Sequence, residues 1–494
     1  MRCDVSVKNV GVGAARVVGF LSLFMAAGRV AAEALPETAA GRQMAAWLAA
    51  VNSGDKERMR AFEAANGPGV AADPSRVERL VRRDEALWKD SGGFEVEKVL
   101  GSDEGKIAVA VRQKELGYWM QFGMGVAAEA PHGVTGFGFR GMEMPAELLP
   151  KEVLPEKEIA ARTEALIDAL VTRDQFSGVI LVAQGERVIY QRAAGMANVE
   201  RQVPNRVDTK LNIASMGKMF TAVAVGQLVE AGKLRYEETL AEALPKYPDR
   251  ELAGKVTIAQ LLSHTSGIEN PGYASKEAMV ALFARGLRKV GEYVPTEKVD
   301  KLAFEPGTKY AYSNYGFTLL GAIVEQASGE DFYAYLRVHV YAPAGMTDTD
   351  AGEIGNGVAN VAMGYMDMPG GGRKVNTPVV PARGLPAGLG YSTGLDMARF
   401  AEALRGGKLL KAATMEELWK PREDTGVGRM YGYGFHVTRY NGQRIVGHTG
   451  GWDGITCAFD MYPELGYSVV ILNNIDSAPS PVTFKLREWL TQGR

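Results

Sequence analysis

Between residues 35 and 142, the spacing of apolar positions changes from helical to strand-like. Apolar residues first recur every three or four positions, which is typical of helices with one buried face. After Gly92 and Gly93 the apolar runs become short and alternate with polar residues and turn signals, which predicts strands. The expected helices carry Met44, Trp47, Leu48 and Val51, then Met59 and Phe62, then Val77, Leu80, Val81, Leu87 and Trp88, and the expected strands lie near 94–100, 107–112, 118–124 and 134–139. Helices followed by an antiparallel run of strands predict a small α+β domain.

A second unit is expected after residues 143–156, a segment with three prolines that is typical of a semi-stiff linker. An amphipathic helix through Ile159 and Leu170 comes first. Two apolar runs, 178–182 and 188–190, then flank a short turn and predict a β-hairpin. The middle of the unit has mainly helical spacing, and another amphipathic helix ends the chain.

These patterns predict an α+β fold overall. In the larger domain, residues 157–494, an antiparallel sheet is flanked by helices and accompanied by a mainly helical subdomain. The smaller α+β domain, residues 35–142, precedes it and carries no convincing catalytic set, so we predict that it is non-catalytic.

The first 34 residues have the three parts of an export signal. Three basic residues precede an apolar stretch at 17–28 that is too short to span a bilayer comfortably. Ala32 and Ala34 then stand where a signal peptidase reads small residues, and residues 30–32 offer a rival site. We predict a signal peptide at 1–34 and a periplasmic or secreted protein; the alternative is an N-terminal helix that stays on the chain. No later segment predicts a transmembrane anchor.

Composition narrows the function classes. The chain has 494 residues, 46% hydrophobic and 23% charged, with a formal net charge of -2. A nucleic-acid-binding protein usually shows a basic excess or a dense basic run, and neither is present. Of the two cysteines, Cys3 lies in the leader, so Cys457 is expected to be a small buried residue of a strand rather than a reactive thiol. The five histidines form no close set with thiolates, so we expect no metal and no other cofactor.

Ser215 and Lys218 are the first candidates for chemistry. Ser215 is expected to begin a helix, and residues three apart on a helix share a face, so the lysine amine can reach the serine hydroxyl. A serine next to a partly deprotonated lysine is an activated nucleophile. The Ser-x-x-Lys spacing is weak evidence alone, because Ser53 and Lys56 repeat it in a turn between two expected helices, where helix N-capping is the obvious role of the serine.

Two later segments complete a possible site. Tyr312 and Asn314 follow a turn-rich loop; a tyrosine near an ammonium group can hold its proton loosely and act as general base or relay. The alternative is a buried tyrosine with a loop-capping asparagine. His448, Thr449, Gly450 and Gly451 follow a short strand and can line a cleft with backbone N–H groups, which favours an oxyanion hole; the alternative for the histidine is a surface loop.

Together these motifs resemble those of the serine β-lactamase and penicillin-binding superfamily, in particular the branch of class C β-lactamases, D-stereospecific peptidases and esterases. The likeness runs from about residue 176 to the C-terminus. It also includes 261–268, 304–307, 312–316, 343–346 with Thr349, and 388–393, in the family's order.

The resemblance implies a β-lactamase/transpeptidase-like fold and a role for each matching residue. Ser215 would be the nucleophile, Lys218 the activating lysine and Tyr312 the proton-transfer tyrosine. Asn314, His448, Thr449, Gly450 and Gly451 would bind the substrate, with the N–H groups of Ser215 and Gly451 as oxyanion donors. His448 departs from the family's usual lysine, which makes the positive charge at this position conditional and weakens the case for strong β-lactamase activity. His264 also matches a family position, and we assign it to loop packing.

The leading hypothesis is therefore an exported serine hydrolase of carboxylesterase or D-amino-acid peptidase type, which acts on a small ester, amide or peptide. A β-lactamase or penicillin-binding protein is the alternative within the family. A catalytically silent binding protein on the same scaffold is the alternative from another class. All the expected catalytic positions are filled, which favours an enzyme.

Overall fold

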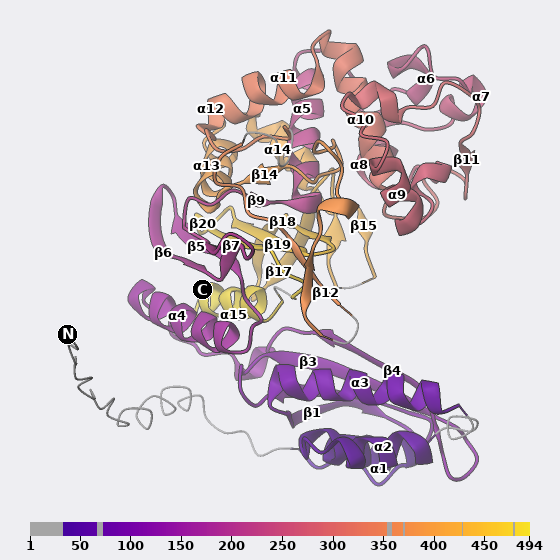
Figure 1. Cartoon of the computed structure of the whole chain (residues 1–494), viewed down its shortest axis with the longest axis vertical. Helices are drawn as coiled ribbons and strands as arrows, with labels where there is room; N and C mark the ends of the chain where they lie inside the picture. The colour runs from indigo at the N-terminus through magenta and orange to yellow at the C-terminus, as the bar shows by residue number, and fades with distance from the viewer. Residues whose placement is uncertain (1–32, 67–72, 353–357, 369–370, 427, 478–479) are drawn as a thin grey trace, which may run out of the picture. The chain divides into compact units, whose positions relative to one another are not determined.

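The computed structural model describes residues 33–66, 73–352, 358–368, 371–426, 428–477 and 480–494 (Figure 1). The predicted signal peptide therefore lies, except for Glu33 and Ala34, outside the described residues, as does Cys3. The chain forms two units, one of residues 1–112 and 122–138 and one of residues 113–121 and 139–494. The domain boundaries drawn from the sequence remain predictions.

Three helices and a four-stranded sheet make up the N-terminal part. Each helix begins with a side chain that accepts a backbone N–H, from Thr38, Asp55 and Asp73 respectively, which satisfies donors that a helix start leaves free. The helices are α1 (Ala39–Asn52), α2 (Lys56–Ala65) and α3 (Pro74–Ser91). The sheet has the order β1-β2-β3-β4, with β1 (Phe94–Ser102), β2 (Lys106–Gln113), β3 (Trp119–Val126) and β4 (Val134–Gly141). Trp47 and Phe122 pack edge to face in its core, with ring centroids 5.3 Å apart.

A buried acidic pair lies between α2 and α3. Arg83 pairs with both Glu63, at 2.9 Å, and the fully buried Asp84, at 2.7 Å, and Trp47 donates to Asp84 at 3.3 Å. Burial, and then the nearby Asp84, raise the pKa of Glu63 above its usual range. Folding therefore favours the protonated form of Glu63.

This pair predicts a pH dependence of stability. Because the folded pKa of Glu63 lies above the unfolded one, its contribution is fully present below the unfolded pKa and is lost as the pH rises through the folded pKa. The Glu63→Gln variant should therefore be more stable than the wild type at pH 8, by on the order of 1 kcal/mol, and equal to it near pH 4. Hydrogen exchange of α3 peptides at the two pH values measures this; equal protection of variant and wild type at pH 8 would contradict it.

The second unit is built on an eight-stranded, antiparallel sheet in the order β15-β16-β17-β18-β19-β20-β5-β6. The predicted hairpin is its β5–β6 edge. β5 is buried along six consecutive residues, which is typical of a strand that is covered on both faces. The strands are β5 (Gly178–Gln184), β6 (Arg187–Ala194), β15 (Glu423–Asp424), β16 (Met430–Tyr431), β17 (His436–Tyr440), β18 (Gln443–Trp452), β19 (Ile455–Tyr462) and β20 (Tyr467–Asn473).

Helices from distant parts of the chain flank this sheet. The first and last helices of the unit, α4 (Glu156–Thr172) and α15 (Ser480–Thr491), lie side by side against it (Figure 1). Helix α13 (Gly394–Arg405) packs on β5 and β20, where Gly394 faces Val179 and Leu181. The α+β fold with an antiparallel sheet flanked by helices is thereby confirmed.

The helical subdomain is the segment between the hairpin and the last strands. Its central helix, α5 (Gly217–Glu230), is buried nearly all round, which is typical of a helix in the core of a large domain. The other helices are α6 (Leu240–Ala243), α7 (Arg250–Ala253), α8 (Ile258–Leu262), α9 (Lys276–Phe283), α10 (Asn314–Ser328), α11 (Phe332–Tyr335), α12 (Ala342–Ala344) and α14 (Ala412–Trp419), with a π-helical turn at Leu336–Tyr341 and 3₁₀ turns at Ala214–Met216, Pro271–Tyr273, Val290–Tyr293 and Thr377–Val379. Outside this segment, a further 3₁₀ turn at Ala146–Leu148 precedes α4. Short strands pair as β7 (Met196–Asn198) with β8 (Val203–Pro204), β9 (Leu211–Asn212) with β14 (Tyr391–Ser392), β10 (Ile268–Glu269) with β11 (Lys301–Leu302) and β12 (Tyr365–Asp367) with β13 (Arg373–Val375).

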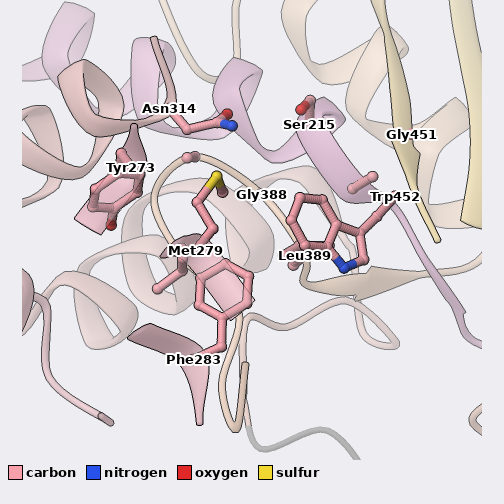
Figure 2. A pocket seen from close by; sticks show the side chains of 12 residues that line it. Ser215, Tyr273, Met279, Phe283, Asn314, Gly388, Leu389, Gly451 and Trp452 are labelled. Atoms are coloured by element: carbon pink, nitrogen blue, oxygen red, sulfur yellow. The ribbon is translucent and has the colours of Figure 1, made fainter. Parts of the chain in front are cut away.

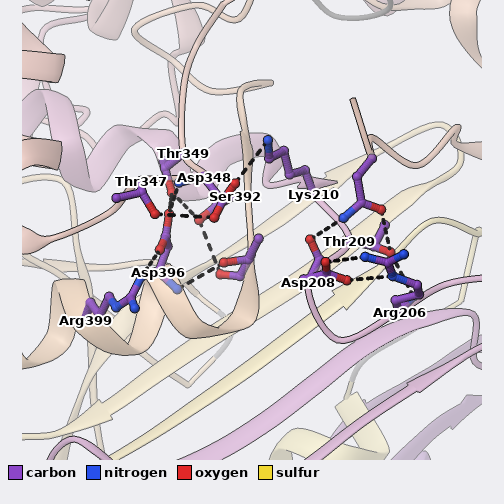
Figure 3. A network of polar contacts seen from close by, with 12 residues as sticks. Arg206, Asp208, Thr209, Lys210, Thr347, Asp348, Thr349, Ser392, Asp396 and Arg399 are labelled. Atoms are coloured by element: carbon purple, nitrogen blue, oxygen red, sulfur yellow. Dashed lines mark hydrogen bonds and ion pairs between the residues drawn. The ribbon is translucent and has the colours of Figure 1, made fainter. Parts of the chain in front are cut away.

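A buried polar network holds the segment that leads to Ser215 (Figure 3). Asp396, in the first turn of α13, accepts hydrogen bonds from the backbone N–H of Asp348 at 2.7 Å and from the Thr349 hydroxyl at 2.8 Å. Thr349 also bonds Ser392 of β14 at 2.7 Å. Because β14 pairs with β9, which ends three residues before Ser215, this network fixes the approach of the chain to the candidate nucleophile.

Candidate active site

Ser215 lies in a tight turn rather than in the first turn of a regular helix. The 3₁₀ turn Ala214–Met216 precedes α5, and Ala214 has φ of 41°, in the left-handed region. The sequence predicted that Ser215 begins a helix; it stands two residues before α5 starts. The turn presents the serine at the N-terminal end of α5, where the helix dipole favours negative charge.

Lys218 is fully buried and makes three polar contacts. Its Nζ lies 3.2 Å from Ser215 Oγ, 2.7 Å from Asn314 Oδ1 and 2.6 Å from the carbonyl oxygen of Ala387. The Tyr312 ring lies beside it, with its centroid 4.8 Å from Nζ. The structure thus brings together the four residues that the sequence predicted from two separate motifs.

These contacts fix the direction in which the Lys218 lone pair points. Burial lowers the pKa of Lys218 well below its usual value, which favours the neutral amine. Asn314 Oδ1 and the Ala387 carbonyl oxygen only accept hydrogen bonds, so they take the two hydrogens of a neutral amine. The remaining lone pair then faces the Ser215 hydroxyl, as a proton acceptor requires.

Tyr312 lies next to the serine, just before α10 begins. Its hydroxyl group lies near enough to Ser215 for the serine to lower the pKa of Tyr312. Although 43% of the Tyr312 surface is exposed, desolvation outweighs that effect and raises the pKa of Tyr312. The sequence predicted a loosely held proton; the raised pKa instead favours a protonated phenol that relays protons over one that rests as a base.

His448 lies in β18 and is buried, so the alternative of a histidine on a surface loop is wrong. Its Nδ1 donates to the carbonyl oxygen of Thr449 at 2.5 Å, and its Nε2 accepts from the Tyr431 hydroxyl at 3.0 Å. Burial lowers the pKa of His448 to about 3. The imidazole is therefore neutral at neutral pH, and the positive charge that the sequence treated as conditional is absent.

Arg429 supplies a positive charge that sequence reasoning missed. Its Nη1 lies 3.5 Å from the Thr449 hydroxyl and 3.4 Å from His436 Nδ1. Burial lowers the pKa of Arg429, yet a guanidinium stays protonated at physiological pH. Within the residues that the structure describes, no carboxylate lies at ion-pair distance from it. No motif marks Arg429, because its place beside Thr449 depends on the pairing of β15, β16 and β17.

Gly450 and Gly451 bring a strand edge against the serine turn. A Cβ on Gly450 would lie 2.4 Å from Cys457 Sγ and 2.8 Å from the Cβ of Ala214, whereas one on Gly451 would meet no atom within 4 Å. On the β17 side, pairing ends at Gly447, so 448–452 has no strand partner there among the described residues. This free edge can offer backbone N–H groups to a substrate oxygen.

A hollow beside the serine, which we call the Ser215 pocket, completes the site (Figure 2). It encloses about 350 Å³, its open mouth included. The pocket is lined by Ala214, Ser215, Tyr273, Met279, Phe283, Asn314, Leu385, Ala387, Gly388, Leu389, Gly451 and Trp452. Its polar side chains are those of Ser215 and Asn314 and the Tyr273 hydroxyl, and most of the rest is apolar, as in many small-molecule sites.

Comparison with known proteins assigns the family. The beta-lactamase family model matches residues 163–490. The chain belongs to the beta-lactamase family. As expected from the sequence, it is a serine hydrolase of this family. Residues before 163 lie outside the part of the chain that the family model matches.

Three relatives of this beta-lactamase family member illustrate the range of the family. Penicillin-binding protein 4* of Bacillus subtilis (strain 168) is 30% identical over 333 residues, which cover 63% of this chain and 71% of that protein. Esterase EstB of Burkholderia gladioli is 29% identical over 385 residues, which cover 68% of this chain and 96% of that protein. The crystal structure of a penicillin binding protein from Bacillus halodurans superposes with a TM-score of 0.59 at 30% identity, covering 64% of this chain and 98% of that one.

Gly388 gives the beta-lactamase family site its tightest backbone contact. It has φ of 135°, and a Cβ there would lie 2.1 Å from the carbonyl oxygen of Ala214, next to Ser215. The Gly388→Ala variant should lose about 2–4 kcal/mol of stability, and its folded fraction should hydrolyse esters at least about 10-fold more slowly.

Gly232 offers the matched control for this variant. It also has a positive φ, of 69°, but a Cβ there meets no atom within 4 Å. Gly232→Ala should cost about 1 kcal/mol and leave the specific activity unchanged. Urea unfolding and ester hydrolysis of the two variants test the prediction; equal losses in both would show that backbone strain alone, and not contact with the serine turn, limits Gly388.

The other predicted residues have structural surroundings. Ser53 ends α1, and its hydroxyl group accepts the backbone N–H of Asp55. The side chain of Asp55, and not that of Ser53, caps the N-terminus of α2. The expected N-capping role of Ser53 is therefore wrong, because the residue caps the C-terminus of α1. His264 is buried, and its Nδ1 accepts the N–H of Ser313 at 3.1 Å, which agrees with loop packing. Cys457 is buried in β19 and donates to the Ile213 carbonyl oxygen at 3.1 Å; burial raises its pKa, as expected for an unreactive thiol.

Neither a metal-binding cluster nor a membrane-spanning helix occurs among the described residues. In those ranges, no group of three or more His, Cys, Asp or Glu side chains is placed to hold a metal ion. Nor does any helix of the described ranges combine the length and the apolar character that crossing a bilayer requires.

Proposed function

We propose that this protein is an exported serine hydrolase that cleaves an ester or amide through an acyl-enzyme on Ser215, as a carboxylesterase or a D-amino-acid peptidase does. The observation that carries the proposal is the buried Lys218 amine, 3.2 Å from Ser215 Oγ, with its other hydrogen bonds taken by two carbonyl oxygens. Export rests on the leader pattern of residues 1–34 alone.

The first half of the reaction forms the acyl-enzyme. Ser215 Oγ attacks the carbonyl carbon of the substrate while its proton passes to Lys218 Nζ. The backbone N–H groups of Ser215 and Gly451 hold the negative oxygen that results. When the bond to the leaving group breaks, Tyr312 gives its proton to the leaving oxygen or nitrogen and takes one from Lys218. Enzyme and substrate atoms balance: the alcohol or amine departs, and the acyl group stays on Ser215.

The second half returns the enzyme to its starting state. A water molecule attacks the acyl carbon, and its proton passes to Tyr312 and Lys218 as the oxyanion forms again. When this tetrahedral intermediate collapses, the bond between the acyl carbon and Ser215 Oγ breaks. Ser215 Oγ recovers a proton, and the carboxylic acid leaves. Water must approach from the side that the leaving group vacated, next to Tyr312.

The neutral His448 supports an esterase or peptidase over a strong β-lactamase. A fixed cation facing the substrate carboxylate would favour a β-lactam, and the pKa of His448, about 3, leaves that position uncharged at neutral pH. Esterase EstB, among the relatives, carries an esterase name.

One observation favours the second candidate, a β-lactamase or penicillin-binding protein. Arg429 Nη1 lies 3.5 Å from the Thr449 hydroxyl and can supply the charge that His448 lacks. A substrate with a carboxylate on its leaving-group side would gain from it. Penicillin turnover or a stable penicillin adduct would favour this candidate, and ester turnover without either would favour the first.

A partition experiment tests the proposal. Esters that share one acyl group but have different phenol leaving groups must pass through the same acyl-enzyme. Methanol added to the reaction should then compete with water at one fixed ratio of methyl ester to acid, whatever the leaving group. A ratio that changes with the leaving group would mean direct attack of water and would overturn the proposal.

A further inference from the structure

The Ser215 pocket differs in chemistry from the rest of the site. Met279 and Phe283, both from α9, Leu389, and Trp452 at the end of β18 form one apolar wall (Figure 2). Ser215 and Asn314 lie together along the opposite side. The Ser215 hydroxyl and the Asn314 amide thus lie on one side of the pocket, and apolar side chains line the other side.

The position of Tyr312 decides which part of a substrate enters this pocket. Tyr312 lies near Ser215, and its ring centroid is 6.4 Å from that of His448, yet neither Tyr312, His448 nor Thr449 lines the pocket. The leaving group must lie beside Tyr312 to receive its proton. The acyl group therefore extends to the other side of the serine, into the Ser215 pocket.

The aromatic wall is held in one orientation. Trp452 Nε1 donates to the carbonyl oxygen of Val379 at 2.8 Å, and the Trp452 and Phe283 rings have centroids 5.7 Å apart. On the opposite flank, the Tyr273 hydroxyl bonds Thr318 at 3.1 Å. A wall fixed by its own contacts binds without the cost of ordering its side chains.

None of the twelve lining residues carries a charge. One charged pair, Lys276 with Asp453, joins α9 to the turn after Trp452, and neither of its residues lines the pocket. A charged acyl group would lose its hydration in the pocket without gaining a partner.

From this juxtaposition we propose that the Ser215 pocket selects substrates whose acyl group is uncharged and apolar, with an aromatic or branched aliphatic side chain. The inference rests on the proposed acyl-enzyme at Ser215 and adds the substrate class. Phe283 and Trp452 are the residues that determine the specificity.

Esters with a constant leaving group test the selectivity. We would measure kcat/KM for p-nitrophenyl acetate, butyrate, phenylacetate and the negatively charged hemisuccinate, each divided by its rate of alkaline hydrolysis. Phenylacetate should exceed acetate by roughly 10²-fold, because its ring is removed from water in the pocket, and hemisuccinate should fall below butyrate by about 10-fold or more. Equal values for acetate and phenylacetate, or a preference for hemisuccinate, would overturn the proposal.

Variants locate the selectivity in the pocket. Phe283→Leu should lower the phenylacetate-to-acetate ratio about 10-fold. Phe332→Leu, at a fully buried phenylalanine in α11 outside the pocket, is the matched control and should leave the ratio unchanged. Met279→Lys, compared with Met279→Leu, should raise the hemisuccinate-to-butyrate ratio at least about 10-fold, because the amine would pair with the carboxylate. Unchanged ratios in Phe283→Leu and in Met279→Lys would contradict the assignment.

The same experiments separate this inference from the proposed function. If Ser215→Ala lost all ester turnover and the wild type did not discriminate between acyl groups, the acyl-enzyme on Ser215 would be supported and only the proposed apolar specificity would be contradicted. Full turnover in Ser215→Ala would remove both.

Discussion

Replacing Ser215 by alanine should lower kcat for a p-nitrophenyl ester by about 10⁴-fold or more. The alanine variant lacks the hydroxyl oxygen at which the Lys218 lone pair points, 3.2 Å away, and so has no activated nucleophile there. Ser215 makes few packing contacts that alanine would lose, so the variant should unfold within about 1 kcal/mol of the wild type. Steady-state hydrolysis and urea unfolding of the same preparation measure both quantities.

Ser53 provides the matched control. It stands in the same Ser-x-x-Lys spacing, but Lys56 pairs with Glu85 at 3.0 Å and Ser53 bonds the backbone of its own turn. Ser53→Ala should keep full esterase activity. If Ser215→Ala retained turnover while Ser53→Ala lost it, the nucleophile would lie at the other motif.

Replacing Lys218 by methionine should lower kcat/KM for the same ester by about 10⁴-fold. Methionine fills a similar volume but accepts no proton, so Ser215 would lose its base. Asn314 Oδ1 and the Ala387 carbonyl oxygen would also lose their donor, at a cost of about 1–3 kcal/mol for each group left unsatisfied. Activity per folded molecule is therefore the quantity to compare.

Lys218→Arg separates a proton acceptor from a positive charge. Arginine donates hydrogen bonds and stays charged, yet its guanidinium cannot give up a proton at physiological pH. We expect Lys218→Arg to be as inactive as Lys218→Met. Substantial activity in the arginine variant would show that the site needs a cation, and not a base, beside Ser215.

The sequence predicted the features that depend on local spacing. A three-residue offset places Lys218 and Ser215 on one side of a helix start, and the turn between two apolar runs makes β5 and β6 a hairpin. The order of the motifs identified the family, which the match over 163–490 establishes. Whether the named residues carry the chemistry remains a proposal.

The features that could not be predicted from the sequence depend on burial and on contacts between distant segments. The chemical type of His448 suggested a conditional charge, whereas its burial beside Tyr431 lowers its pKa and keeps the imidazole neutral. Arg429 reaches Thr449 because the four strands β15 to β18 pair with one another in sequence. The wall of the Ser215 pocket joins α9 to the end of β18, segments about 170 residues apart whose apolar residues look like ordinary core in the sequence.

The site of acylation can be measured by intact mass of the enzyme, quenched in acid during turnover of p-nitrophenyl phenylacetate, followed by peptide mapping. We expect a single phenylacetyl adduct on the peptide that contains Ser215, and none in Ser215→Ala. An adduct on any other residue, or one that Ser215→Ala retains, would contradict the proposed acyl-enzyme on Ser215.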